Sequence, residues 1–244
     1  MDDVTLLFAT DLDGTLLGPD SRVSARTRAA LRRAFDHPEM DVVFVTGRPL
    51  RWMTGIADET GHDGTAICAN GALVLDLVTM EPEAVHGISE PTAEEVRARL
   101  SELEPNFAFG SESAAGEVVK LLAWAPSDAG HHVDLLLPRA LERVNDLVEV
   151  THSNPDDLLL EMSALGVSKA STLEHYAAER GLSPEHVVAV GDMPNDIPML
   201  RWAGQSYAVG NAHPHAAAAA DAVIPANTED GVAQLLEQVL DSLE

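Results

Sequence analysis

Apolar runs of strand length alternate with stretches of helical periodicity near both ends of this chain. Early in the chain, Val4–Ala9 has the pattern of a buried strand, and Ser24–Phe35 has apolar residues three and four positions apart, as in a helix. The alternation returns late, where Val187–Val190 has the strand pattern and Gly231–Leu243 that of an amphipathic helix. Further strands are predicted at Asp41–Val45, Tyr207–Val209 and Ala222–Ile224, and further helices at Pro49–Glu59, Ser171–Arg180 and Ile197–Ala203. Such alternation predicts a parallel sheet covered by helices on both faces.

The middle of the chain, from about residue 82 to 165, has a different pattern. Candidate strands there come in pairs joined by short turns, which favours a mixed or antiparallel sheet. These strands are predicted at Ala84–Ile88, Asn106–Phe109, Val118–Trp124, Val148–His152 and Leu158–Met162. Two helices are predicted between them, Thr92–Leu103 and about residues 129–142, and we expect Pro138 to break or bend the second.

Together these patterns predict an α/β protein with an insertion. Residues 1–81 and 166–244 are expected to form one Rossmann-like core, a doubly wound parallel sheet. Residues 82–165 are expected to form an inserted α+β domain. A chain of 244 residues is long enough to bury both cores.

Composition excludes several classes of partner and site. The chain has 40 Asp and Glu against 15 Lys and Arg, a formal net charge of −25. Nucleic acid and anionic membranes are bound mostly through Lys and Arg, so we expect neither as a partner. Cys68 is the only cysteine, which excludes an intrachain disulfide and a zinc–thiolate cluster. Neither a signal peptide nor an apolar run of membrane-spanning length is visible, so we expect a soluble, cytoplasmic protein.

The most specific local signal follows the first predicted strand, where residues 11–15 read Asp-Leu-Asp-Gly-Thr. Asp11 and Asp13 lie where α/β folds place their active sites, at the carboxyl end of the sheet. Gly14 permits a sharp turn there. An Asp-Gly pair alone is typical of an ordinary acidic turn. The full string FATDLDGTLL after an N-terminal strand is far more specific, and it predicts an active site.

This string resembles motif I of the haloacid dehalogenase (HAD) superfamily, most of whose members are phosphotransferases. Motif II is matched by Thr-Gly-Arg at residues 46–48, motif III by Lys169, and motif IV by Gly-Asp-Met-Pro-Asn-Asp at residues 191–196. Each match lies where the family places it, in the correct order. Three further fragments, at residues 70–72, 210–212 and 229–233, resemble the Cof-type branch, subclass IIB, whose inserted cap domain is of type C2B.

The resemblance implies Asp11 as the nucleophile and Asp13 as the general acid and base. It also implies a Mg²⁺ ion held by the carboxylates of Asp11 and Asp192 and by the backbone carbonyl of Asp13, with Asp196 behind them orienting a metal-bound water or Lys169. Electrostatics agrees with a cation, because each pair of like charges about 4 Å apart costs roughly 4 kcal/mol at an effective dielectric near 20. A site made only of oxygen atoms selects Mg²⁺.

The resemblance also implies a set of donors for the phosphate group of the substrate: Thr46, Gly47, Lys169 and Asn195. Such donors hold the charge of the equatorial oxygens while the phosphoryl group transfers. Outside these motifs, Thr46 would be an ordinary helix cap and Lys169 a solvated lysine.

The sequence therefore predicts a Mg²⁺-dependent phosphatase that acts on a small soluble phosphomonoester through an aspartyl-phosphate intermediate. A sugar phosphate and a small phosphorylated acid such as phosphoglycolate are both compatible substrates. Two alternatives stay open: a phosphomutase of the phosphomannomutase type, and a non-catalytic protein that binds a phosphorylated ligand. The oligomeric state, monomer or dimer, is open as well.

Substrate identity is expected to depend on the insertion, because caps at this position cover the active site and contact the leaving group. No motif is recognised within residues 82–165. His86, Lys120 and Arg48 are polar candidates for that contact, although each has the pattern of a surface residue. Some other residues are expected to be structural: the packing residues Trp52, Trp124 and Trp202, the turn residues Asp156 and Asp157, and the histidine pairs 131–132 and 213 with 215, which we do not expect to bind metal.

The remaining acidity points to the solvent. The motif aspartates are only four of the 40 acidic residues, so nearly all of the others must lie on the surface. Only two of the 15 basic residues are lysines. This composition resembles that of salt-adapted proteins, and we hypothesise a cytoplasm of high salt concentration.

Overall fold

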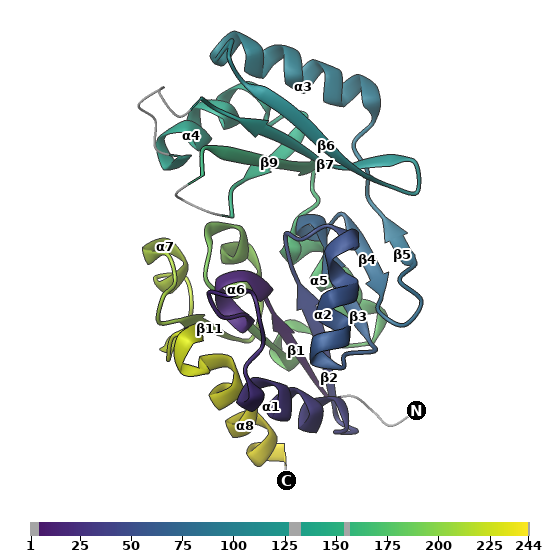
Figure 1. Ribbon diagram of the computed structural model, residues 1–244, viewed down its shortest axis with the longest axis vertical. Coiled ribbons are helices and arrows are strands. Elements are labelled where there is room, and N and C mark those ends of the chain that lie inside the picture. The colour runs from purple at the N-terminus through teal and green to yellow at the C-terminus, as the bar shows by residue number, and fades with distance from the viewer. Residues whose placement is uncertain (1–4, 127–132, 154–156, 244) are drawn as a thin grey trace.

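The computed structural model describes residues 5–126, 133–153 and 157–243, which form two sheets with helices packed on them (Figure 1). The larger sheet has the strand order β12-β11-β10-β1-β2-β3-β4-β5. Its strands are β1 (Leu6–Thr10), β2 (Met40–Val45), β3 (Thr65–Cys68), β4 (Leu73–Asp76), β5 (Pro82–Val85), β10 (Val187–Gly191), β11 (Gln205–Val209) and β12 (Ala222–Ile224). From β12 to β3 the strands are parallel, and β4 and β5 are each antiparallel to their neighbours.

Helices cover both faces of this sheet. They are α1 (Ala25–Phe35), α2 (Met53–Thr60), α5 (Lys169–Glu179), α6 (Ile197–Trp202), α7 (Pro214–Ala217) and α8 (Gly231–Leu243). Successive side chains of a strand point to opposite faces. Phe8 of β1 accordingly packs in one cluster with α1, α2 and α8, whereas Leu7 and Ala9 pack in another with α5, α6 and α7. The predicted doubly wound α/β core is confirmed.

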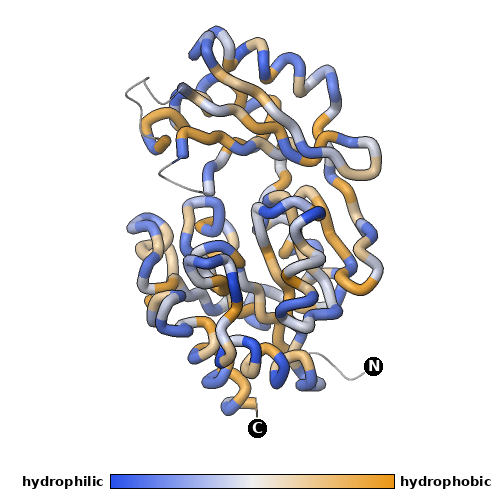
Figure 2. The backbone as a smooth tube through the Cα atoms, in the orientation of Figure 1, coloured by the Kyte–Doolittle hydropathy of each residue, from blue (hydrophilic) through white to orange (hydrophobic). Residues whose placement is uncertain are grey.

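The smaller sheet is antiparallel, with the order β6-β7-β9-β8, and lies beyond the end of the larger one (Figure 1). Its strands are β6 (Ala108–Ala114), β7 (Glu117–Trp124), β8 (Val148–Thr151) and β9 (Leu159–Ala164), and its helices are α3 (Glu90–Leu103) and α4 (Val133–Val144). Both helices pack on one face of the sheet, against residues such as Leu121 and Leu160, in a core of their own. Apolar residues accordingly gather inside each of the two bodies (Figure 2). This is the α+β cap that the sequence predicts.

Several details differ from the expected elements; among them, the strand expected at Asn106–Phe109 forms as β6, Ala108–Ala114. Strands β3 and β4, of four residues each, were not predicted. The strand expected at Ala84–Ile88 forms as β5, residues 82–85, and pairs with β4 in the larger sheet. Helix α4 runs through Pro138 instead of ending there. Proline removes one backbone hydrogen bond, and the burial of Leu136 and Ala140 on either side of it holds the helix together.

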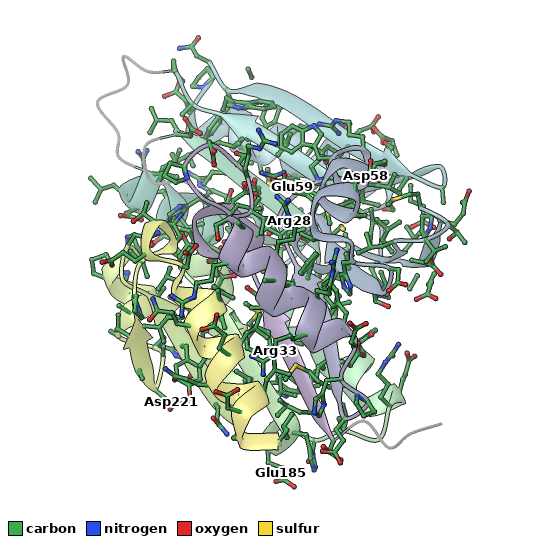
Figure 3. The ribbon with its side chains drawn as sticks, turned by 60° about the horizontal axis from the view of Figure 1, so that its bottom comes forward. Arg28, Arg33, Asp58, Glu59, Glu185 and Asp221 are labelled. Atoms are coloured by element: carbon green, nitrogen blue, oxygen red, sulfur yellow. The ribbon has the colours of Figure 1, made fainter. Side chains whose placement is uncertain are left out.

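The outer surface is charged. Arg28 of α1 and Glu59 of α2 form an ion pair at 3.7 Å (Figure 3), and Arg33 of α1 pairs with Asp241 of α8 at 3.1 Å. Isolated pairs of this kind contribute about 0–1 kcal/mol each. None of the helices in the described ranges combines the length and the apolar composition that crossing a bilayer requires.

Candidate active site

Three adjacent strands deliver the predicted site residues to one edge of the larger sheet. Asp11 directly follows β1, Thr46 directly follows β2, and Asp192 directly follows β10. Because β1 lies between β2 and β10, and all three are parallel, their carboxyl ends meet. Lys169, the first residue of α5, reaches the same place, and its side chain is only 1% exposed.

The ammonium of Lys169 is held between two carboxylates. Its Nζ atom donates to Asp11 Oδ1 at 2.6 Å and to Asp196 Oδ1 at 2.7 Å. The other oxygen of Asp196 accepts the backbone N–H groups of Asp192 and Met193, at 3.0 and 2.9 Å. Burial by itself lowers the pKa of Lys169, but the charges of Asp11 and Asp196 outweigh burial and raise it above its usual range. The lysine is therefore a fixed cation.

A second carboxylate faces Asp11 from the turn after β10. Asp192 is buried, and Thr15 donates to its Oδ1 at 2.9 Å. A side chain at Gly14 would meet Asp192 Oδ2 at 2.3 Å, and φ there is +78°, so this position requires glycine. Burial raises the pKa of Asp11 to about 7 and that of Asp192 to about 8, the latter with help from the charge of Asp11.

The carboxylates form a possible metal site. Asp11, Asp192 and Asp196 each place an oxygen within 4.8 Å of the others, and all three are buried. Burial is the main cause of the raised pKa values of Asp11 and Asp192, the neighbouring carboxylates add to it, and the nearby Lys169 does not offset the two together. A hard divalent cation takes carboxylate oxygens as ligands, so the donor set fits such an ion.

Asp13 points away from this cluster. Its carboxylate accepts two hydrogen bonds from Arg48, from Nε at 2.7 Å and from Nη2 at 2.5 Å. The side chain of Asp13 is 54% exposed, and that of Arg48 is 12% exposed. Two parallel N–H···O bonds are the strong form of this ion pair. Asp13 is thus only two residues from Asp11 in the sequence, but its carboxylate is bound to Arg48 and not to the groups around Asp11.

Thr46 is fully buried, and its hydroxyl oxygen accepts the backbone N–H of Arg48 at 3.0 Å. Asn195 is also buried, and its amide donates to Asn70 Oδ1 at 3.1 Å. Asn195 Oδ1 is buried without a hydrogen-bond partner among the described residues. The structure brings these two residues to the same edge as Asp11.

A cavity of about 820 Å³ lies over these groups. From the larger sheet and its loops, Asp11, Asp13, Gly47, Asp192 and Asn195 line it. Thr46 and Lys169 are buried behind this lining. The cap contributes the opposite wall through β6, β7, β9 and the chain before β9, with Glu112, Lys120, Leu122, Trp124, Ser153, Leu159 and Glu161.

The pleat of the cap sheet explains this wall. Glu112 lies opposite Lys120 and Leu122 lies opposite Glu161, so these residues share one face of the sheet. The intervening Leu121 points to the other face, where it packs in the core of the cap. Lys120 and Glu161 are diagonal neighbours on the cavity face, which is close enough for long side chains to interact.

A buried polar network joins this face to the loops of the larger sheet. Lys120 Nζ lies 3.4 Å from Glu161 Oε1 and also donates to the backbone carbonyl of Gly47. Asn70 donates to Glu161 Oε2 at 2.7 Å, and Ser153 donates to Glu161 Oε1 at 3.1 Å. Lys120, expected as a surface residue, is instead 3% exposed because these acceptors satisfy its charge. The available signal for Lys120 was a single charge within the predicted strand Val118–Trp124, and for Glu161 a single charge within Leu158–Met162.

Two of the three tryptophans are not packing residues. Trp52 is 54% exposed and Trp124 39% exposed, and both line the cavity. Trp202 packs against the core, as predicted. His86 is exposed and does not line the cavity.

The other predicted polar positions fall in several places. Arg48 lines the cavity and is mostly buried by its pairing with Asp13. His213 lines the cavity too, with Nε2 at 3.7 Å from Asp134 of the cap, and its Nδ1 accepts the backbone N–H of His215. The pair 131–132 and Asp156 lie outside the described residues.

The chain is similar to known proteins in sequence and in fold. The model of the haloacid dehalogenase-like hydrolase family matches residues 8–116 and 127–236. A 5-amino-6-(5-phospho-D-ribitylamino)uracil phosphatase of Bacillus subtilis is 31% identical over 239 residues, 94% of each chain. A phosphoglycolate phosphatase of Natronomonas pharaonis is 30% identical over 241 residues, 96% of this chain and 98% of that one. A solved subclass IIB sugar phosphatase of the HAD superfamily has the same fold, with a TM-score of 0.79 at 20% identity over 96% of this chain and 98% of that one.

Proposed function

The chain belongs to the haloacid dehalogenase-like hydrolases and is a phosphatase of that family, and from this premise we propose that it hydrolyses small phosphomonoesters with Mg²⁺, through an aspartyl-phosphate on Asp11. The observation that carries the proposal is the position of Asp11. Its carboxylate lines the cavity while Lys169 holds its Oδ1 atom, so we assign Oδ2 as the attacking oxygen. Attack forms the bond from Oδ2 to phosphorus and breaks the bond from phosphorus to the leaving oxygen.

Asp13 is the group we assign to proton transfer. It also lines the cavity, and a rotation of its side chain away from Arg48 turns its carboxyl toward the leaving group. Asp13 gives a proton to the leaving alkoxide in the first step. In the second step it takes a proton from the water that attacks the aspartyl-phosphate, which restores Asp11 and releases phosphate.

The proposed Mg²⁺ ligands are the carboxylates of Asp11 and Asp192 and the backbone carbonyl of Asp13. Asp196 is assigned a supporting role, because one of its oxygens is bound to Lys169 and the other to two backbone N–H groups. When bound, Mg²⁺ offsets the charge of the carboxylates and polarises the phosphate oxygens.

The phosphate group of the substrate is proposed to accept hydrogen bonds from N–H and O–H groups of the site that are not already used within the protein. The oxygen of Thr46 already accepts from Arg48, so its O–H is left to donate. Asn195 uses one amide N–H on Asn70 and keeps a second. The backbone N–H of Gly47 and the ammonium of Lys169 complete the proposed set.

We propose residues 82–165 as the insertion that carries the cap covering this site, with β5 at its start pairing with β4 in the larger sheet, and residues 1–81 and 166–244 as the catalytic core. The two relatives named above act on a phosphorylated ribityl chain and on phosphoglycolate, and these define the two substrate classes proposed here. A phosphomutase must hold a second phosphate far from the nucleophile. Among the described residues of the cap that line the cavity, Lys120 is the only Lys or Arg, and it is paired with Glu161, so we favour hydrolysis.

The test is an assay with 4-nitrophenyl phosphate, with Mg²⁺ or with a chelator, on the wild type and on Asp11→Asn. We expect Mg²⁺-dependent release of free phosphate by the wild type and none above background by the variant, whose circular dichroism should be unchanged. Incubation with a hexose 1-phosphate distinguishes a phosphatase from a phosphomutase. A phosphomutase would form the hexose 6-phosphate and little free phosphate. A wild type without phosphatase activity on any phosphomonoester would favour the binding protein.

A further inference from the structure

The cavity wall is rich in charge, but its cations are already paired. Three Arg or Lys side chains of the described residues line the cavity, and each has a carboxylate partner that lines it too. The pairs, with their shortest N–O distances, are Arg48–Asp13 at 2.5 Å, Arg51–Glu112 at 3.2 Å and Lys120–Glu161 at 3.4 Å. A carboxylate on the leaving group would have to displace one of these partners.

Displacement is most costly at Lys120, the cation that the cap contributes. The side chains of Lys120 and Glu161 are 4% and 8% exposed. Removing one partner of a buried pair leaves an uncompensated charge away from water. Glu161 is also fixed by the donors Asn70 and Ser153, which hold its carboxylate in the cavity wall.

The same wall offers acceptors to a ligand. Glu112 Oε1 accepts from Arg51, but Glu112 Oε2 is buried without a hydrogen-bond partner among the described residues. A buried carboxylate oxygen is normally hydrogen-bonded. Glu112 lines the cavity, so a small rotation of its side chain would bring this oxygen to a ligand hydroxyl, which would donate to it, whereas a ligand carboxylate would be repelled by the charge of Glu112.

Two aromatic rings complete the wall. Trp52 and Trp124 both line the cavity, and both residues are substantially exposed. The Trp52 ring is flanked by the guanidinium groups of Arg48 and Arg51, with centroid distances of 5.8 and 5.3 Å. Exposed aromatic rings in a cavity bind the apolar C–H surface of a ligand while its hydroxyls meet the polar groups beside them.

We propose that this cavity selects phosphomonoesters with a neutral, hydroxyl-bearing leaving group and rejects those that carry a carboxylate, and that Glu112 and Glu161 determine this selection. The inference rests on the proposed phosphatase function and narrows it: the sugar or polyol phosphate is favoured over phosphoglycolate. Glu112 supplies a free acceptor, and Glu161 keeps the cation of the cap neutralised.

The experiment compares substrates that differ only in a carboxylate. 2-Hydroxyethyl phosphate is paired with phosphoglycolate, and glycerol 3-phosphate with 3-phosphoglycerate, all with the Mg²⁺-loaded protein. We expect kcat/KM to be at least about tenfold higher for the neutral member of each pair, because like charges at a buried wall repel strongly. Equal or higher values for the acids would overturn the inference. 4-Nitrophenyl phosphate serves as the reference: hydrolysis of it together with an acid preference overturns only the inference, and no hydrolysis of any substrate overturns the proposed function as well.

The variants Glu112→Gln and Glu161→Gln test the two residues. Each removes one negative charge and releases a cation, so we expect the neutral-to-acid ratio of kcat/KM to fall about tenfold. Glu94→Gln is the matched control, because Glu94 is exposed on α3 and does not line the cavity. Its ratio should equal that of the wild type. Glu112→Gln, at a partly exposed side chain, keeps the test decisive if Glu161→Gln does not fold. A wild-type ratio in every folded variant would contradict the assignment.

Discussion

The ammonium of Lys169 lies 2.6 Å from the carboxylate of Asp11, and both side chains are buried. This contact joins stability to chemistry, because the same lysine that balances the charge of the nucleophile is assigned to bind the phosphate. The charge of the site is therefore set by a few groups, and each of them has a testable effect.

Lys169→Met should lose both activity and stability. The substitution leaves Asp11 and Asp196 buried without their cation, a loss of about 3–5 kcal/mol in the free energy of unfolding. Urea unfolding with EDTA present measures it. Arg32→Met is the control, because Arg32 is an exposed cation on α1 and its removal should change the free energy by about 0.5 kcal/mol or less. Equal stability of the two variants would contradict the account.

Binding of Mg²⁺ should strengthen as the pH rises. Without a cation, burial raises the pKa of Asp11 to about 7 and that of Asp192 to about 8, so both bind protons in the folded state that they have lost in the unfolded state at the same pH. The folded state of the metal-free protein is therefore favoured at low pH, and this contribution is lost as the pH rises through those values.

Mg²⁺ must displace these protons, so its effect has the opposite slope. We expect the increase in Tm caused by Mg²⁺ to grow between pH 6 and pH 9, and isothermal titration calorimetry in buffers of different ionisation enthalpy to show proton release. Binding of Mg²⁺ that is independent of pH over this range would rule out protonated carboxylates at the site.

Asp13→Asn should separate the two steps of the reaction. 4-Nitrophenolate leaves without needing a proton, so the first step should survive with this substrate. The second step lacks its base and should slow by about 10²–10⁴-fold. Rapid-mixing measurements should show a burst of 4-nitrophenolate close to one equivalent of enzyme, while an alkyl phosphate gives no burst. A uniform loss without a burst on either substrate would remove Asp13 from proton transfer.

Salt should stabilise the protein. The net charge of −25 makes the folded surface repel itself, and salt screens this repulsion. We expect Tm to rise when KCl is increased from about 0.1 M to about 2 M. A variant that neutralises four exposed acids, Asp58→Asn, Glu94→Gln, Glu174→Gln and Glu185→Gln, should show a smaller rise. Greatest stability and activity in dilute buffer would contradict the hypothesis of a high-salt cytoplasm.

The core of the fold was predictable because its signals are local. Val187–Val190 is apolar at every position because β10 is buried on both faces. This apolar run locates the strand in the sequence, and therefore also the position of Asp192 just after its end. Strand β4, Leu73–Asp76, was not predicted, and its antiparallel direction depends on its pairing with β3, which the sequence pattern does not show.

The cavity wall of the cap was not predictable in the same way. Glu112, Lys120 and Glu161 lie on three different strands, and their contact depends on the register of β6, β7 and β9. Trp52 lies in the turn just before α2 of the core, and Trp124 ends β7 of the cap, so their common position at the cavity depends on how the core and the cap pack together. The alternation of strand residues indicated two faces, but not which face would meet the catalytic loops.

The most direct test of the central claim is the detection of a phosphoryl group on Asp11. The Mg²⁺-loaded Asp13→Asn variant, mixed with 4-nitrophenyl phosphate and quenched in acid, should accumulate the intermediate, and borohydride reduction followed by peptide mass spectrometry should find homoserine at position 11. Wild-type protein without substrate is the control and should retain Asp11. Homoserine at position 11 is the result that this account predicts; turnover of the substrate with no modification of Asp11, or with the modification at another carboxylate, would contradict it.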